Sequence, residues 1–495
     1  MGSRHILRHE PFEAFIPEFE RLIADVMQQW NIPGLAVSVV QDGQAPYIKT
    51  FGLRDVEADL PVTPDTQFQI MSVSKSFAAT GLAVLVDEKR VAWSKPVRDY
   101  LPEFRLYDEV ASDRVTVRDL LCHHSGLPRH DWIWLPGDLS PAQVLLAMRH
   151  LEPSADIRTT FQYSNLGYLV ATLVTERVSD QPWPAFIRER LTDKLKMTVT
   201  FTSDELSKAA DAAVPYALTR TGCQRSALWP VSVMAAGGMS ASIAGMTNWL
   251  RFHLGEGEFE GQRLLSPALI HDMQKPLVHV GRTEFSEYSD VHYGLGLRSH
   301  WYNGRHVVWH GGGWTGTNAL LIMMPDYGIG VAILANIGMV PLLTPHILAN
   351  SVFDWLTGVK PVSWFDRLGE QRAKIFSRFD TDRKAANATS TPRTEPSHAL
   401  ADYVGTYEHP GYGQMDISLF EGQLHWAFRG MSEVLAHRHD DVFELPETPK
   451  SPGSLLPGRL AVSFSTDHEG RIASAAIPFE PMVKDIVFQR MPTAN

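Results

Sequence analysis

The chain has 495 residues, of which 44% are hydrophobic and 20% are charged. This composition is typical of a globular protein with a substantial core, and the length predicts two or three domains. The formal net charge of -11 and the lack of a basic stretch argue against general binding to nucleic acid or to an anionic membrane surface. Two cysteines, Cys122 and Cys223, are too few for a disulfide framework, which favours a reducing compartment.

The N-terminal segment, residues 1–30, has no apolar stretch typical of a signal peptide. Its apolar residues recur with helical spacing, which predicts an amphipathic helix whose buried face holds Phe15, Phe19, Leu22, Ile23 and Met27. No apolar run in the chain is long enough to cross a bilayer. We therefore expect a cytoplasmic protein that has no membrane partner.

Predicted strands and helices follow one another in blocks. Two β-rich runs flank Asp42-Gly43, which is a strong hairpin signal. Residues from about 91 to 250 are mainly helical, and strands return around turns at Asn303-Gly304 and Tyr327-Gly328. Residues 342–356 predict a closing helix. The expected fold class is α+β, an antiparallel sheet flanked by helices with an inserted all-helical subdomain.

The composition changes towards the C-terminus. Residues 377–398 are polar, contain proline and lack periodicity, which is typical of a linker. Short strands separated by glycine turns such as Glu421-Gly422 follow, and they predict a small all-β barrel over residues 399–495. The remaining domain spans residues 1–376 and contains the helical insertion at about 91–250.

The motif S-x-x-K occurs once, at Ser72 and Lys75, where a helix is expected to begin. Positions i and i+3 share a helix face, so the lysine amine lies near the serine hydroxyl. A serine hydroxyl becomes a good nucleophile only when a neighbouring base takes its proton, and a neutral lysine is such a base. The alternative is that Ser72 caps the helix and Lys75 is a solvated side chain of the first turn.

The motif Y-x-N also occurs once, at Tyr163 and Asn165, directly before a strongly helical run. On a loop, residues two apart can both point into one cleft, where the phenol carries a proton and the amide forms hydrogen bonds. The alternative is a capping asparagine beside a packed tyrosine.

A run of glycines follows His310 at the end of a predicted strand. Because they have no side chains, Gly311, Gly312 and Gly313 let the backbone approach a ligand closely. A backbone amide after such a run can donate to an oxyanion, and each such donor is typically worth about 10²–10³ in rate. Trp314 comes directly after the glycines and is placed at the same pocket.

In this order, the three motifs resemble those of the serine β-lactamase-like superfamily, specifically its branch of class C β-lactamases, D-aminopeptidases and related esterases. The stretches VTVRDLLCHHSGLP and AAGGMSASIAGMTNWLRF are similar to that family, and the resemblance covers roughly residues 15–358. It implies the β-lactamase/transpeptidase-like fold and a reaction with no metal or organic cofactor. The stretch LADYVGTYEHPGYG resembles the lipocalin-like module that follows this domain in some D-peptidases and peptide-cyclising thioesterases.

The resemblance also implies a role for each motif residue. Ser72 would attack a carbonyl and form an acyl-enzyme, while Lys75 and Tyr163 together take the serine proton and pass it to the leaving group. Asn165 would orient the substrate amide or Lys75, and the backbone amides of Ser72 and Gly313 would form the oxyanion hole. Which of Lys75 and Tyr163 is the immediate base stays open.

β-Lactamases usually have K-T-G where this chain has His310, Gly311 and Gly312. The lysine is a permanent positive charge suited to a substrate carboxylate, whereas a histidine is mostly neutral at pH 7. This difference favours an ester, thioester or amide substrate over a β-lactam. We place four residues beside Asn165 at the substrate-binding pocket: His310, Gly312, Gly313 and Trp314.

The expected function is that of a serine hydrolase, either an esterase or a D-amino-acid-specific peptidase or amidase. Its expected partners are small-molecule esters, thioesters or peptides. A biosynthetic acyltransferase or peptide cyclase of the same fold is one alternative, because the motifs do not fix the acyl acceptor. A catalytically silent binding protein is an alternative of another class. The sequence leaves assembly into a homo-oligomer open.

Two weaker signals lie between the motifs. Trp132 and Trp134 occupy a Pro/Gly loop between predicted helices, where they either form a lid over an apolar acyl group or pack one subdomain on another. His123 and His124 lack the spacing of a metal site and are expected to form hydrogen bonds within the fold.

Overall fold

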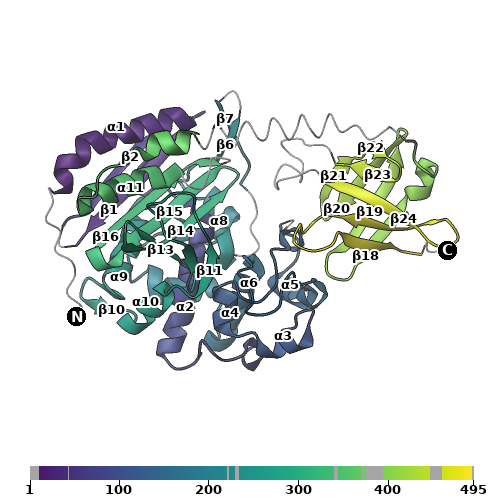
Figure 1. Cartoon of the computed structure of the whole chain (residues 1–495), viewed down its shortest axis with the longest axis horizontal. Helices are drawn as coiled ribbons and strands as arrows, with labels where there is room; N and C mark the ends of the chain where they lie inside the picture. The colour runs from purple at the N-terminus through teal and green to yellow at the C-terminus, as the bar shows by residue number, and fades with distance from the viewer. Residues whose placement is uncertain are drawn as a thin grey trace. The chain divides into compact units, whose positions relative to one another are not determined.

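The computed structural model describes residues 11–42, 44–135, 137–219, 222–228, 234–338, 344–370, 373, 394–445 and 460–492. The chain forms two compact units, each discontinuous in sequence (Figure 1). Unit 1 comprises Met1–Pro102, Asp113–Ser125 and Ile157–Lys374, and unit 2 comprises Glu103–Ser112, Gly126–Asp156 and Ile375–Asn495. The domain boundaries expected at residues 376 and 399 stay a prediction, and residues 377–393 of the expected linker lie outside the described residues.

Unit 1 is built on a nine-stranded antiparallel sheet with the strand order β11-β12-β13-β14-β15-β16-β1-β2-β3. Its strands are β1 (Gly34–Gln41), β2 (Tyr47–Asp55), β3 (Leu60–Pro61), β11 (Val278–Gly281), β12 (Val291–Tyr293), β13 (Arg298–Tyr302), β14 (Arg305–Trp314), β15 (Thr317–Met324) and β16 (Ile329–Ala335). The expected hairpin is confirmed as β1 and β2, although Gly43 of its turn lies outside the described residues. Asn303 and Gly304 have φ values of 46° and 76° and turn β13 into β14, as predicted.

Helices cover both faces of this sheet. α1 (Phe12–Trp30) and α11 (Thr344–Thr357) contact each other and share a buried core with one face (Figure 1). α9 (Ile243–Leu254) packs on the opposite face against β1 and β16. The approach is close: a Cβ on Gly330 of β16 would lie only 3.0 Å from the Leu250 side chain. The sheet is therefore the middle layer of three, as the α+β prediction requires.

The apolar face predicted for the N-terminal helix is present in α1. Phe15, Phe19 and Ile23 are buried against the sheet and α11, while Leu22 and Met27 are partly buried at the edge of the same core. Burial of each such side chain contributes about 1.5–3 kcal/mol relative to leaving it exposed. This packing holds the outer layer on the sheet.

Between the first strands and α9 the chain is mainly helical, as expected. The two longest helices there pack against each other: α2 (Ser74–Asp87) and α6 (Asn165–Ser179). The other α-helices are α3 (Glu109–Arg114), α4 (Val117–Leu121), α5 (Pro141–Ala147), α7 (Trp183–Ile187), α8 (Ser203–Ser207) and, after α9, α10 (Pro267–Gln274).

Short strands that the sequence did not predict occur within and on either side of the helical part. They form the small sheets β4-β8-β5, β17-β6-β7 and β10-β9. Their bounds are β4 (Phe68–Gln69), β5 (Val199–Thr200), β6 (Tyr216–Thr219), β7 (Gly222–Arg225), β8 (Ser240–Ala241), β9 (Glu258–Phe259), β10 (Gln262–Arg263) and β17 (Ile337–Gly338). Strands of two residues carry too little alternation to be read from a sequence.

Unit 2 contains a second nine-stranded antiparallel sheet, in the order β21-β20-β19-β18-β26-β25-β24-β23-β22, which curls into a nearly closed barrel. Its strands are β18 (Gly405–His409), β19 (Gly413–Phe420), β20 (Gln423–Phe428), β21 (Met431–Val434), β22 (Ala436–His439), β23 (Val442–Glu444), β24 (Ala461–Thr466), β25 (Ile472–Ile477) and β26 (Ile486–Arg490). Trp426, Phe428 and Phe488 are fully buried among its core side chains. The predicted all-β barrel is confirmed.

The segment Gly126–Asp156 packs on this barrel as part of unit 2. The indole of Trp132 stacks on Phe479, with ring centroids 4.7 Å apart, and Trp134 donates from Nε1 to the Asp131 carboxylate at 2.8 Å. Both tryptophans are buried. Of the two alternatives for these tryptophans, a lid over an acyl group or packing between parts of the fold, the structure shows packing.

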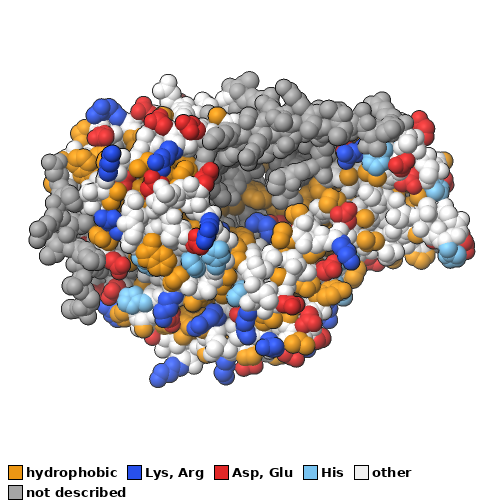
Figure 2. All heavy atoms as spheres, in the orientation of Figure 1, with side chains coloured by type: hydrophobic (Ala, Val, Ile, Leu, Met, Phe, Trp, Pro, Cys, Tyr) orange, Lys and Arg blue, Asp and Glu red, His pale blue; other side chains and the backbone are white. Residues whose placement is uncertain are grey.

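The surface of the described residues mixes charges of both signs. On the face shown in Figure 2, Lys and Arg side chains are interspersed with Asp and Glu side chains. None of the described helices is both long and apolar enough to cross a membrane.

Candidate active site

Ser72 stands at a strained turn that leads into α2. A single 3-10 turn, Met71–Val73, precedes the helix, and Met71 has a φ of 46°, a left-handed conformation that costs a non-glycine residue about 1–3 kcal/mol. Ser72 itself is half-buried, whereas every residue from Val73 to Leu85 is buried. The turn therefore presents the Ser72 hydroxyl at the surface of an otherwise buried element.

The amine of Lys75 is fully buried directly below the serine. Its Nζ lies 3.2 Å from Ser72 Oγ, 2.9 Å from Asn165 Oδ1 and 2.7 Å from the carbonyl oxygen of Ala236. An ammonium can donate one hydrogen to each of these three oxygens. A neutral amine can donate to Asn165 and Ala236, which only accept, and turn its lone pair towards the serine hydroxyl, which can donate. The same partners therefore satisfy both protonation states of Lys75.

Tyr163 reaches the serine from a separate element. Its hydroxyl lies 2.9 Å from Ser72 Oγ, and its ring centroid lies 4.9 Å from Lys75 Nζ. The imidazole of His123 packs on the Tyr163 ring with centroids 4.3 Å apart, and its Nδ1 accepts from the backbone N–H of Ser164 at 3.1 Å. His123 thus holds the loop that carries the tyrosine, a hydrogen bond within the fold as expected.

The glycine run of β14 approaches the serine turn closely. A Cβ built on Gly312 would lie 2.1 Å from the carbonyl oxygen of Ile70 and 3.1 Å from the backbone nitrogen of Ser72. A side chain at this position would therefore displace the serine turn. Gly313 follows and pairs with Asn318 of β15.

His310 is buried on the same strand with both ring nitrogens engaged. Its Nδ1 lies 2.7 Å from the carbonyl oxygen of Gly311, which can only accept, so Nδ1 carries the hydrogen. Nε2 therefore accepts from the hydroxyl of Tyr293 at 2.8 Å. Burial, Lys75 and Arg298 all hold the pKa of His310 well below its usual value, so the ring is neutral at pH 7.

Of the residues placed in the pocket by sequence, the structure joins Ser72, Lys75, Tyr163 and Asn165 by direct hydrogen bonds and brings Gly312 against the serine turn. Trp314 ends β14, and no hydrogen bond or ring contact joins it to those side chains. Its buried indole Nε1 has no acceptor among the described residues. The roles of all these residues stay predictions.

Arg298 and Tyr293 are two neighbours that the sequence did not indicate. The guanidinium carbon of Arg298 lies 6.0 Å from the Tyr163 ring centroid and 5.5 Å from that of Tyr293. A strand that begins with an arginine carries no motif, so the sequence offers no signal for this contact. Arg298 places a positive charge one aromatic ring away from the serine.

A metal site does not emerge from these side chains. In the described ranges, no three or more His, Cys, Asp and Glu side chains are grouped so that they could hold a metal ion. The site brings together the hydroxyl of Ser72, the amine of Lys75 and the phenol of Tyr163.

Comparison with known proteins gives two family matches. Residues 19–339 match the Beta-lactamase family, and residues 389–490 match a domain family described only as a domain of unknown function, DUF3471. The chain is 29% identical over 427 residues to the unguisins hydrolase ungD' of Aspergillus campestris, an alignment that covers 81% of this chain and 77% of that protein.

Two solved structures show the same fold. The octameric penicillin-binding protein homologue from Pyrococcus abyssi is 22% identical, with a TM-score of 0.61, and the match covers 96% of this chain and 100% of that one. A D-stereospecific amidohydrolase from Streptomyces sp. is 25% identical, with a TM-score of 0.52, over 63% of this chain and 94% of that one. The expected β-lactamase-like fold is confirmed.

Proposed function

The chain belongs to the Beta-lactamase family, and on that premise we propose that it is a serine hydrolase that works through an acyl-enzyme on Ser72. The observation that carries the proposal is the contact of the half-buried Ser72 hydroxyl with both Lys75 Nζ and the Tyr163 hydroxyl, at 3.2 and 2.9 Å. Such contacts meet the first requirement for an activated nucleophile, a base within hydrogen-bond reach.

Lys75 is the proton acceptor in the acylation step of this proposal. As the neutral amine it donates to Asn165 and Ala236 and takes the Ser72 proton on its lone pair while Oγ bonds to the substrate carbonyl carbon. The carbonyl oxygen becomes an oxyanion and accepts from the backbone N–H groups of Ser72 and Gly313. The bare α-carbon of Gly312 leaves the Ser72 amide uncovered for that purpose.

Tyr163 is the proton donor to the leaving group. It is half-buried, whereas Lys75 is fully buried, so the phenol reaches outgoing atoms that the amine cannot. When the carbon–leaving group bond breaks, the phenol gives up its proton and regains one from Lys75. Deacylation runs the same path in reverse, with water as nucleophile, and releases a carboxylic acid and free Ser72.

The substrate class we propose is an ester, or an amide that contains a D-amino acid. The neutral His310 supplies no positive charge where β-lactamases usually have lysine, which disfavours β-lactams. Two similar proteins carry the names unguisins hydrolase and D-stereospecific amidohydrolase, which support hydrolysis over acyl transfer. For the barrel of unit 2 we retain the lipocalin-like assignment, supported by its nine antiparallel strands.

The test is the intact mass of the protein after brief incubation with p-nitrophenyl butyrate, with released nitrophenol followed in parallel. Wild type should gain one butyryl group and release nitrophenol, and Ser72→Ala should do neither. Ser74→Ala is the matched control, because the Ser74 hydroxyl contacts the backbone N–H of Met239 instead of the site. A butyryl adduct on Ser72→Ala, or one that persists in water until an amine or alcohol is added, would contradict the proposal.

A further inference from the structure

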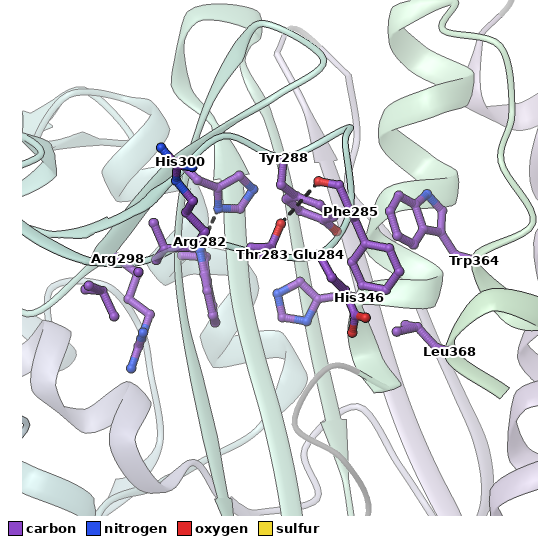
Figure 3. A pocket seen from close by; sticks show the side chains of 14 residues that line it. Arg282, Thr283, Glu284, Phe285, Tyr288, Arg298, His300, His346, Trp364 and Leu368 are labelled. Atoms are coloured by element: carbon purple, nitrogen blue, oxygen red, sulfur yellow. Dashed lines mark hydrogen bonds between the residues drawn. The ribbon is translucent and has the colours of Figure 1, made fainter. Parts of the chain in front are cut away.

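A cavity of about 530 Å³ lies behind the central sheet, on the face that α11 covers (Figure 3). His346 of α11 lines it, and the His346 ring packs on Trp309 of β14 with centroids 4.8 Å apart. Side chains alternate along a strand, so Trp309 and Gly312 project to opposite faces of β14. Since Gly312 faces Ser72, the sheet separates this cavity from the serine.

The walls of the cavity are largely aromatic. Phe285, Tyr288, Trp309 and Trp364 line it, and Phe285 and Tyr288 each pack on Trp364 with ring centroids 5.2 and 5.4 Å apart. Its volume falls in the range of about 300–1,000 Å³ that is usual for small-molecule sites. Such walls suit an apolar ligand body that is aromatic or branched.

One cation on the lining is available to a ligand. Arg298 forms no ion pair with any described residue, and its guanidinium carbon lies 5.4 Å from the Trp309 ring centroid. Arg282 also lines the cavity, but its side chain is 84% exposed and pairs with Asp290 at 3.3 Å. Glu284, the acidic residue of the lining, does not pair with Arg298. A half-buried guanidinium without a counter-ion is a strong site for a carboxylate, which it can bind through two parallel hydrogen bonds.

His300 adds a hydrogen-bond donor on the same wall. Its Nδ1 accepts from Trp309 Nε1 at 2.9 Å, so the hydrogen of the neutral ring is on Nε2. The side chain is 2% exposed, and Nε2 has no acceptor among the described residues. A buried donor without an acceptor costs free energy that an oxygen of a ligand would recover. Figure 3 shows the His300 ring on the cavity wall beside Tyr288.

We propose that this cavity is a second ligand site, distinct from the serine site, which binds a small apolar carboxylate. The carboxylate pairs with Arg298 and accepts from His300, while the aromatic or branched body lies against Trp309, Tyr288 and Trp364.

A ligand bound in the cavity affects the serine site through Arg298, whose side chain lines the cavity and lies beside the Tyr163 ring. Its charge lies 6.0 Å from the Tyr163 ring centroid and favours negative charge that develops there and on the reacting carbonyl oxygen. A carboxylate bound to Arg298 cancels much of that field. The bound ligand therefore lowers the rate of acylation without blocking access to Ser72.

Calorimetry with 3-phenylpropanoate and its neutral amide, 3-phenylpropanamide, tests the binding. The acid should bind wild type about 10- to 100-fold more tightly than the amide, because hydrogen bonds to charged groups are the stronger ones. Arg298→Gln should erase that difference and Arg298→Lys should restore part of it. Arg282→Gln, the matched control on the same lining, should change the affinity by no more than about twofold. Equal binding of acid and amide, or discrimination that survives in Arg298→Gln, would overturn the proposal.

Kinetics with p-nitrophenyl butyrate then distinguish the two sites. In single-turnover measurements of nitrophenol release, the acid should lower the acylation rate at saturating ester by about fivefold and leave the half-saturating ester concentration nearly unchanged, a typical size for coupling between sites. Purely competitive inhibition would place the ligand in the serine site and overturn the proposal. The calorimetric arm does not depend on turnover, so an absence of nitrophenol release would contradict the proposed function alone.

Discussion

Each unit contains a cluster of hydrogen-bonded polar side chains around a tyrosine, but the two clusters differ in exposure. In unit 1, Ser72 and Tyr163 are half-buried above the buried Lys75. In unit 2, His130, Tyr412 and Glu480 are 0%, 1% and 2% exposed. Solvent can reach the first cluster, whereas the second is enclosed by the fold.

In the unit 2 cluster, both ring nitrogens and the backbone N–H of His130 have hydrogen-bond partners. His130 Nε2 donates to the carbonyl of Glu152 at 2.9 Å, so Nδ1 accepts from the Tyr412 hydroxyl at 2.7 Å, and the His130 N–H donates to the Glu480 carboxylate at 2.7 Å. The partners of the serine cluster satisfy more than one protonation state of Lys75, while in the unit 2 cluster burial lowers the pKa of His130 and favours its neutral ring. Similar residue types therefore lie at an accessible surface in unit 1 and in a closed core in unit 2.

After the complete loss expected of Ser72→Ala, the largest effect we predict comes from Tyr163→Phe. Loss of the phenol removes the proton donor to the leaving group and should lower the acylation rate by about 10²–10⁴. Rapid-mixing measurement of nitrophenol release checks this value, and Tyr412→Phe in unit 2 is the matched control that should acylate normally. A wild-type rate in Tyr163→Phe would remove this residue from the mechanism.

Gly312→Ala should have the next largest effect. The added methyl would meet the Ile70 carbonyl oxygen at 2.1 Å and push the serine turn away, which should slow acylation by roughly 10². Gly311→Ala is the control, since its Cβ would meet Trp309 at an ordinary 3.6 Å. If both variants acylate alike, close approach at Gly312 is not required.

Tyr412→Phe should reduce stability instead of activity. It leaves the buried Nδ1 of His130 without a donor, which should cost about 1–3 kcal/mol in the free energy of unfolding. Urea denaturation followed by a probe in unit 2 measures this loss. Tyr107→Phe, at a 60% exposed position of the same unit, should change stability by less than about 0.5 kcal/mol. Equal stabilities for the two variants would contradict the structural role of the cluster.

The smallest effect we predict is a pH dependence of unit 2. Burial, helped by His150 and His130, lowers the pKa of His409 to about 4, and its Nδ1 accepts from the backbone N–H groups of Gly411 and Tyr412. Between pH of about 6.5 and 4 the unfolded chain binds a proton that the folded chain does not, so stability is full above this window and is lost as pH falls through it. The loss should be on the order of 1–2 kcal/mol, given the partial exposure of the ring.

Hydrogen exchange of barrel peptides across this pH window checks the dependence. His409→Asn, which keeps an acceptor and cannot titrate, should flatten it. A slope that is unchanged in His409→Asn would assign the pH dependence to other groups.

Local patterns in the sequence predicted much of the fold and part of the candidate site. Ser72 and Lys75 are neighbours because i and i+3 share a helix face, and Asn303-Gly304 turns a hairpin because both residues accept positive φ. Local patterns could not indicate that Arg298 lies at the site, because its contact with Tyr163 depends on how β13 packs against a loop distant in sequence. The Ala236 carbonyl beneath Lys75 could not be found either, since every residue has one.

The two tryptophans of the Pro/Gly loop illustrate a different limit. A loop rich in aromatic residues is compatible with both a lid and a packed interface, and Trp132 is assigned to packing only once Phe479 is seen against it. The partner lies in the last strand region of the chain, so no local pattern carries the information.

The discontinuity of unit 2 has a consequence for how the chain folds during synthesis. The backbone N–H of His130 has its hydrogen-bond acceptor on Glu480, 350 residues later in the chain, and the ring of Trp132 packs on Phe479. Neither contact can form before these later residues are synthesised. Until the last strands leave the ribosome, the segment around Trp132 displays apolar surface without its partner, and contacts of such high sequence separation form slowly. The later partners of the serine turn and α2, which include Ala236 and Gly312, all precede the barrel strands in the chain, so nascent chains should complete the serine site before the barrel closes. Translation that stalls late in the message would then release a protein with a finished serine site and an aggregation-prone segment.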